Sequence, residues 1–127
     1  MALGLTDTQA NAWLNTLRGT AYSVATPYVK LHTGDPGATG TANASAETLR
    51  KLVGFNAPSA DAIALTAAVS WAAWSVGNET LTHVSLWDHL SAGNCLWTGI
   101  LSAGKAMTNG DTFTLSTLTV GLTPSAA

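Results

Sequence analysis

The stretch from Tyr28 to Gly40 constrains the fold most, because it alternates like a β-strand and then stops in a tight turn. Successive side chains of a strand point to opposite faces, so Val29 and Leu31 share one face while Lys30 and His32 share the other. One face can therefore meet a core and the other can meet water. This pattern predicts a β-rich domain.

The strand is predicted to end in a turn at Asp35-Pro36-Gly37. Pro36 presets φ for the second position of the turn, Gly37 accepts the positive φ of the third position in type II, and the Asp35 side chain can accept a bond from its own backbone. Asp35 could also be interpreted as a catalytic acid, but its place before Pro36 gives it a structural role. The Gly-, Ala- and Thr-rich segment 37–45 predicts an exposed loop and a candidate contact surface.

The length of 127 residues indicates one domain, residues 1–127, large enough to bury about two thirds of the surface of the unfolded chain. The single cysteine, Cys95, excludes an intrachain disulfide. There is no basic, apolar leader and no run of about 18 apolar residues, so we expect a soluble protein with no membrane partner. Five basic residues and a formal net charge of -2 argue against nucleic acid as a partner.

Charged residues make up only 9% of the chain, against about 25% in an ordinary globular protein. A small monomer usually stays soluble through mixed surface charge. The sparse charge therefore predicts that neighbouring subunits cover much of the surface, as in a homo-oligomer. The alternative is a neutral, threonine-rich β surface that is soluble by itself.

A short helix is predicted at about residues 7–18. Thr6 or Asp7 can cap its start, Gln9 follows Thr6 at the capping-box spacing, and Gly19 can close its end. We expect its apolar stripe to dock on the sheet of the same chain, and a helical arm laid on a neighbouring subunit is the alternative. The stripe supplies three candidate core or interface residues, Trp13, Leu14 and Leu17.

Period-2 patterns predict a β domain over about residues 27–122. In the segment 63–71 a strand is favoured over an alanine-rich helix, because the bulky residues alternate. The segment 80–88 carries large apolar groups on both faces, which is typical of a central strand in a sandwich or closed barrel. Further strands are expected near 50–56, at 95–101 paired antiparallel with 80–88, at 105–108 and at 112–122. The predicted class is mainly β, an antiparallel β-sandwich or barrel-like domain with one short N-terminal α-helix.

The last predicted strand changes phase at Ser116-Thr117, so a β-bulge or bend is expected there to return its apolar residues to the core. Pro124 is expected to end the pairing and leave a short C-terminal tail. The strand patterns supply six more candidate core or interface residues: Leu31, Trp71, Leu86, Trp87, Phe113 and Val120.

The side chains suited to chemistry are few. The histidines at 32, 83 and 89 are interpreted as strand or loop residues with hydrogen-bond partners, because no nucleophile motif accompanies them. Asp88 and His89 could begin a metal site, but adjacent strand residues diverge and no further ligand lies at a suitable spacing. We therefore expect no enzymatic activity, no catalytic or metal-binding residue and no cofactor. Trp74, just beyond an alternating run, is a candidate partner contact.

The order of short motifs along the chain is more specific than any one of them. They are Tyr28-Val-Lys-Leu-His-Thr-Gly-Asp-Pro-Gly37, Thr82-His83, Leu86-Trp87-Asp88, Gly93 to Gly99 with Leu96 between, Lys105, Gly110-Asp111-Thr112 and Leu118-Thr-Val-Gly-Leu122. In this order the chain resembles a family of small structural proteins of tailed-bacteriophage virions, labelled minor tail, tail-fibre-like or minor capsid proteins. That family commonly has alanine where Gly34 stands and a glycine-rich stretch near 72–78.

The resemblance implies a virion component, assembled in the cytoplasm of the host bacterium, with a β-sandwich-like fold and an oligomeric setting. A compact chain without heptads or collagen-like repeats suits a capsid-decorating minor capsid protein better than a long fibre shaft. We expect a small symmetric cluster, such as a trimer, that binds the major capsid protein and stabilises the assembled head. The alternative is a minor tail or tail-fibre-like protein involved in tail structure or host contact.

Overall fold

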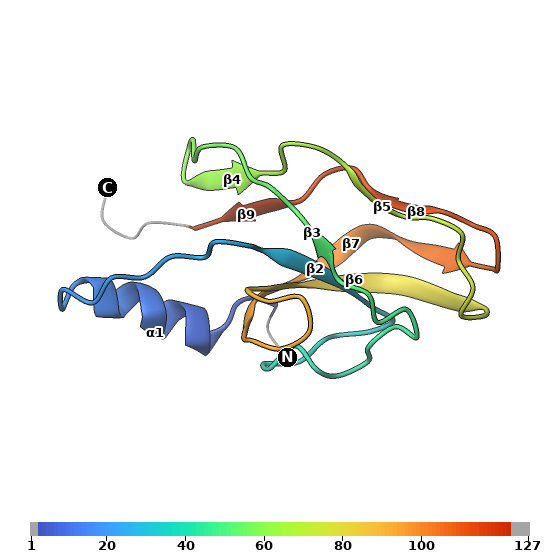
Figure 1. Cartoon of the computed structure of the whole chain (residues 1–127), viewed down its shortest axis with the longest axis horizontal. Coiled ribbons are helices and arrows are strands. Elements are labelled where there is room, and N and C mark those ends of the chain that lie inside the picture. The colour runs from blue at the N-terminus through green and yellow to red at the C-terminus, as the bar shows by residue number, and fades with distance from the viewer. Residues whose placement is uncertain (1–2, 123–127) are drawn as a thin grey trace.

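The computed structural model of the chain describes residues 3–122, and it is mainly β with one short helix (Figure 1). Two layers of antiparallel strands lie one above the other, and they do not close into a barrel. This confirms the predicted sandwich-like class and corrects its barrel alternative. The predicted tail around Pro124 lies outside the described residues. Within residues 3–122, no helix has the length and apolar character needed to cross a membrane.

The larger layer is a five-stranded antiparallel sheet in the order β1-β7-β6-β2-β3. Its central strand is β6 (Glu79–Trp87), flanked by β2 (Tyr28–His32) and β7 (Cys95–Met107). The outer strands are short: β1 (Gly4–Leu5) pairs with β7, and β3 (Lys51–Leu52) pairs with β2. The burial of β6 residues on both faces confirms the prediction of a central strand for this segment.

Two strand predictions in this layer were wrong. The strand expected near 50–56 is reduced to β3. The strands expected at 95–101 and 105–108 are one strand, because β7 continues through Gly104 between them. The pairing instead shifts register between Leu81 with Lys105 and His83 with Ile100, so β7 places four residues opposite a single residue of β6. Such a bulge bends a strand without ending it, which is why a glycine did not mark a break.

The smaller layer is a bent ribbon made of two strand pairs. β4 (Ala62–Ala64) pairs with β9 (Thr119–Gly121), and β5 (Val69–Trp71) pairs with β8 (Phe113–Leu115). The continuous strand predicted over 63–71 is therefore two short strands. Both sides of the ribbon leave strand geometry at the same place, which confirms the bend predicted at Ser116-Thr117.

The main core lies between the two layers. Val29 and Leu31 of β2 are fully buried, and Leu81 of β6 joins them. The predicted core residues Leu31, Trp71, Leu86, Phe113 and Val120 all belong to this cluster. Trp87 is also buried, but outside this cluster, on the face of β6 that it shares with Ser85.

The helix α1 (Asp7–Thr16) begins as predicted, since the Thr6 hydroxyl oxygen accepts the backbone N–H of Gln9 at 3.3 Å. It ends in a Schellman motif in which Gly19, with φ of 86°, donates its N–H to the carbonyl of Thr16, and Thr20 donates to Asn15. The predicted closing role of Gly19 is thereby confirmed.

The expectation that the whole apolar stripe of α1 packs on its own sheet was wrong. Trp13 does so, with its ring 6.3 Å from that of Trp97 on β7. Leu14 and Leu17, however, are 60% and 85% exposed. The reason is that α1 projects from one end of the sandwich and touches the sheet only on the Trp13 side (Figure 1).

Candidate interaction surface

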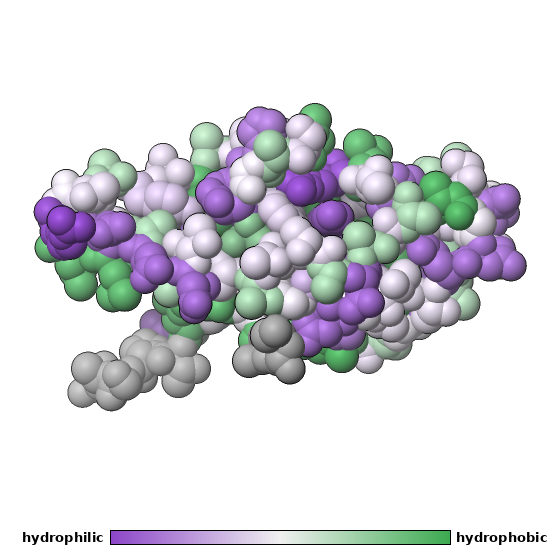
Figure 2. All heavy atoms as spheres, turned by 90° about the horizontal axis from the view of Figure 1, so that it is seen from below, coloured by the Kyte–Doolittle hydropathy of each residue, from purple (hydrophilic) through white to green (hydrophobic). Residues whose placement is uncertain are grey.

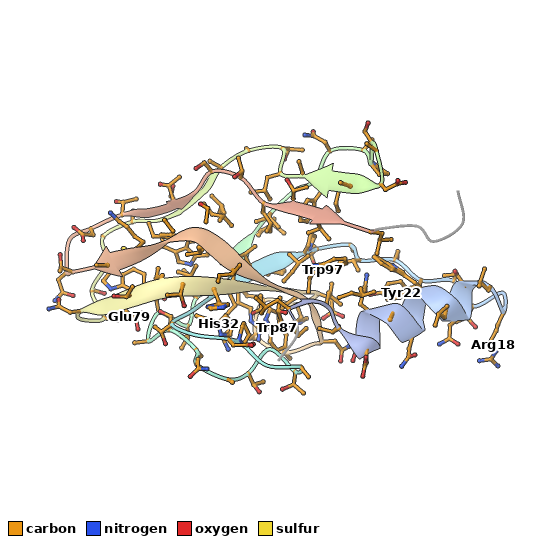
Figure 3. All side chains as sticks on the ribbon, turned by 180° about the vertical axis from the view of Figure 1, so that it is seen from behind. Arg18, Tyr22, His32, Glu79, Trp87 and Trp97 are labelled. Atoms are coloured by element: carbon orange, nitrogen blue, oxygen red, sulfur yellow. The ribbon has the colours of Figure 1, made fainter. Side chains whose placement is uncertain are left out.

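The outer face of the large sheet, opposite the small layer, is covered by the loop between β2 and β3. His32 is fully buried there, although its position on β2 predicted contact with water. Its Nδ1 donates to the carbonyl of Ala42 at 2.9 Å, which leaves Nε2 to accept the hydroxyl of Ser85 at 2.7 Å. Trp87 donates its Nε1–H to the same hydroxyl oxygen at 2.7 Å (Figure 3). The cover thus turns a polar strand face into a second, hydrogen-bonded interior.

His32 and Ser85 have the spacing of a general base and a nucleophile, a pairing that sequence reasoning missed. The signal was the alignment of β2 with β6, which places Lys30 opposite Ser85 and thereby sets His32 diagonal to it. Burial lowers the pKa of His32 from its ordinary value of 6.5, so the ring is neutral at neutral pH. Because both side chains are buried, a substrate has no direct access to this pair.

The loop between β6 and β7 is held by side chains that were first considered as metal ligands. Asp88 accepts the backbone N–H of Asn94 at 2.7 Å, and His89 Nδ1 accepts the N–H groups of Ser91 and Ala92. Among residues 3–122, no group of three or more His, Cys, Asp or Glu side chains is placed to hold a metal ion. Asp88 and His89 therefore fix the backbone of this loop.

The predicted turn at Asp35-Pro36-Gly37 has the expected geometry. The Asp35 carboxylate accepts the N–H of Gly37 at 2.8 Å, and Gly37 has φ of 76°. Pro36 is buried beneath the returning chain. The segment 37–45 is largely exposed, as the predicted loop should be, although Gly40 and Ser45 are buried in it. The turn residues thus shape a loop that covers the sheet.

Trp74 does not provide the partner contact that was predicted for it. Its side chain is only 2% exposed, and its Nε1–H donates to the carbonyl of Gly77 at 2.9 Å. Its backbone is tied to the turn before β8 through bonds with Gly110 and Asp111. The ring completes the core, so it is not available on the surface.

An apolar hollow lies beside α1, where the two layers separate (Figure 1). An open groove of about 560 Å³ runs between the helix with the chain that follows it and the β4–β9 pair. Its lining includes Trp97, on the large sheet near the middle of the molecule, and Tyr22, beside the helix (Figure 3). Asp61 is the one charged residue among those that line the groove. We call this feature the aromatic groove, after its aromatic residues Trp13, Tyr22, Phe55 and Trp97.

A second feature, the helix tip, lies at the same end of the molecule and consists of Leu14, Leu17 and Arg18. Figure 2 shows apolar side chains (green) gathered at the left end of the molecule, next to hydrophilic side chains (purple). Arg18 extends away from the body of the protein, with its guanidinium donating to Asn15 Oδ1 at 3.1 Å (Figure 3). Exposed apolar side chains and an apolar hollow are features of protein interaction surfaces, so the helix tip and the aromatic groove are treated together as the candidate interaction surface.

A family model described as Podophage GP4 fiber I protein gp80 matches residues 4–123 of the chain. Among curated proteins, none matches the sequence significantly. The fibre description supports the tail-fibre-like alternative more than the capsid-decorating role that was expected first. The match spans nearly the whole chain and does not single out the motif from Leu31 to Gly37. The chain belongs to the phage virion structural protein family described as Podophage GP4 fiber I protein gp80.

Proposed function

We propose that this protein is a non-enzymatic subunit of a tail-fibre-like part of the phage virion, and that it works as a homo-oligomer in contact with other virion proteins. The observation that carries the proposal is the match of residues 4–123 to a fibre protein family. On this proposal the protein is assembled into the particle inside the host cell and needs no cofactor.

The way in which the loops are held supports a structural role. Asp35, Asp88 and His89 each accept backbone N–H groups within their own loops. Arg50 donates to two carbonyls of the loop between β6 and β7. Side chains committed to such bonds keep a surface in one shape, which suits a building block of an assembly.

The surface composition supports an oligomeric setting. The chain has 9% charged residues, and large apolar side chains remain exposed at the helix tip. Burying such side chains against a neighbour removes apolar area from water, which favours association. The alternative of a self-sufficient neutral surface explains the low charge but gives no role to the exposed leucines.

The proposal is tested on purified virions by electron microscopy with gold-labelled antibody against the protein, together with its copy number by quantitative mass spectrometry. Label at the tail and few copies relative to the major capsid protein are expected. Label spread over the head, with copies comparable in number to the major capsid protein, would instead support capsid decoration. Absence of the protein from purified particles would overturn a virion role.

A further inference from the structure

Within residues 3–122, the helix tip presents two leucines that remain largely exposed, Leu14 and Leu17. Leu14 lies on α1 and Leu17 is its C-cap residue, which still has helical backbone angles, so the two side chains lie on one side of the helix. Trp13 faces the sheet, as its contact with Trp97 shows. The two leucines stay exposed because α1 projects from one end of the sandwich, so that its C-terminal end lies away from the sheet (Figure 1).

The aromatic groove is the complementary feature, because it is an apolar hollow open to solvent. Its floor includes Trp97 and its opposite wall includes Ile63 of β4. Its volume of about 560 Å³ is large enough to hold two leucine side chains. Helix α1 lines the groove with Gln9 and Trp13, whereas Leu14 and Leu17 are not among the residues that line it.

The charges of the two features are opposite. Arg18 is the one basic residue between positions 3 and 27, and it stands at the helix tip. Asp61, the one charged residue that lines the groove, is exposed at its rim. A protruding tip with a cation and a hollow with an anion form a matched pair.

We propose that the helix tip of one copy of this protein docks into the aromatic groove of a second copy, with Leu14 and Leu17 in the groove and Arg18 beside Asp61. A second copy of the chain is the expected occupant, because every copy carries both the helix tip and the aromatic groove. The inference rests on the proposed role as a homo-oligomeric subunit and names the surface through which copies meet.

The first test measures self-association of the purified protein by sedimentation equilibrium. The Leu14→Gln/Leu17→Gln variant is expected to weaken the association at least about tenfold, since two apolar anchors are lost. The matched control is Leu52→Gln, which changes a leucine on β3 that is also more than half exposed and lies outside the groove. The control is expected to associate like the original protein, and circular dichroism checks that each variant is folded.

The second test identifies the two surfaces as partners. The variants Arg18→Asp and Asp61→Arg are each expected to weaken association about threefold to tenfold, and the double variant is expected to regain most of the loss. Independently, mixing Leu17→Cys protein with Ala62→Cys protein under mild oxidation is expected to give a disulfide-linked pair faster than either variant alone. Ala62 lies in the groove wall, and the native Cys95 is buried.

Three results would overturn the inference: a protein that stays monomeric at millimolar concentration, association that is indifferent to the leucine changes, or a charge exchange without recovery. Association that persists through another face would refute the docking site and leave the tail-fibre proposal standing. A failed virion label would refute the tail-fibre proposal and leave the measured self-association unaffected, so the two failures are distinguishable.

Discussion

The guanidinium carbon of Arg50 lies 3.9 Å from the centroid of the Trp87 ring. The same guanidinium donates through Nη1 to the carbonyls of His89 and Ala92, both at 2.8 Å. One side chain from the segment before β3 thereby joins the end of β6 to the loop that follows it. A planar cation can stack on a ring and bond sideways at the same time, which a lysine ammonium cannot do as well.

The substitution Arg50→Lys is therefore expected to lower the free energy of unfolding by about 1–3 kcal/mol, through loss of the stacked contact and of at least one carbonyl bond. Urea unfolding followed by tryptophan fluorescence measures it. Arg18→Lys is the matched control, because Arg18 is exposed, and a change within about 0.5 kcal/mol is expected. Equal effects at the two positions would contradict the role assigned to Arg50.

Gly40 is expected to be intolerant of any side chain. Its φ is 73°, and a Cβ atom at this position would lie 2.4 Å from Sγ of Cys95. Gly40→Ala should therefore combine backbone strain with overpacking and lower the free energy of unfolding by about 2–5 kcal/mol. Thermal unfolding monitored by circular dichroism measures the loss.

Gly110→Ala separates the two causes in this prediction. Gly110 also has a positive φ, 93°, but a Cβ there would meet nothing within 4 Å. Only the backbone strain of about 1–2 kcal/mol is expected for this variant. Equal destabilisation of the two variants would show that the contact of an added Cβ at position 40 with Cys95 does not contribute to the loss of stability.

The sequence predicted local features well because their causes are local. The Thr6 cap, the Gly19 closure, the Asp35 turn and the bend after Leu115 each depend on residues within a few positions. Strand β6 was predicted because its alternation runs without interruption. Periodicity and capping depend on residues that are close in the sequence, so they can be predicted from one sequence.

The covered outer face and the aromatic groove were not predictable in the same way. Arg50 meets a loop about forty residues away, and His32 meets Ser85 across more than fifty. Trp74 was misjudged for the same reason, since the turn at Gly110 and Asp111 draws it into the core. Contacts between segments that are distant in the sequence produce no periodic pattern of residues. They depend on the tertiary structure and could not be predicted from the sequence.

The buried His32 is expected to make stability depend on pH. Its pKa is lowered in the folded protein by burial, so below about pH 6.5 the unfolded chain binds a proton that the folded chain resists. The free energy of unfolding should therefore fall as the pH decreases from 7 toward 5, by at most about 1.4 kcal/mol per pH unit for this group. Urea unfolding at several pH values checks this. The His32→Gln variant should have a lower free energy of unfolding at pH 7, and that free energy should change less with pH. Parallel pH profiles for the two proteins would contradict the prediction.

Cys95 is expected to be unreactive while the protein is folded. Burial raises the pKa of its thiol from 9.0 to about 11, which lowers the thiolate fraction about a hundredfold at mildly alkaline pH. Reaction with a chromogenic disulfide reagent should therefore be slow in the native protein and fast in denaturant. Gly40→Ala should speed the native reaction, because the added methyl pushes on Sγ and loosens the loop above it. Rapid labelling of the folded original protein would show that the loop opens readily, and the cover over the sheet would then be a mobile one.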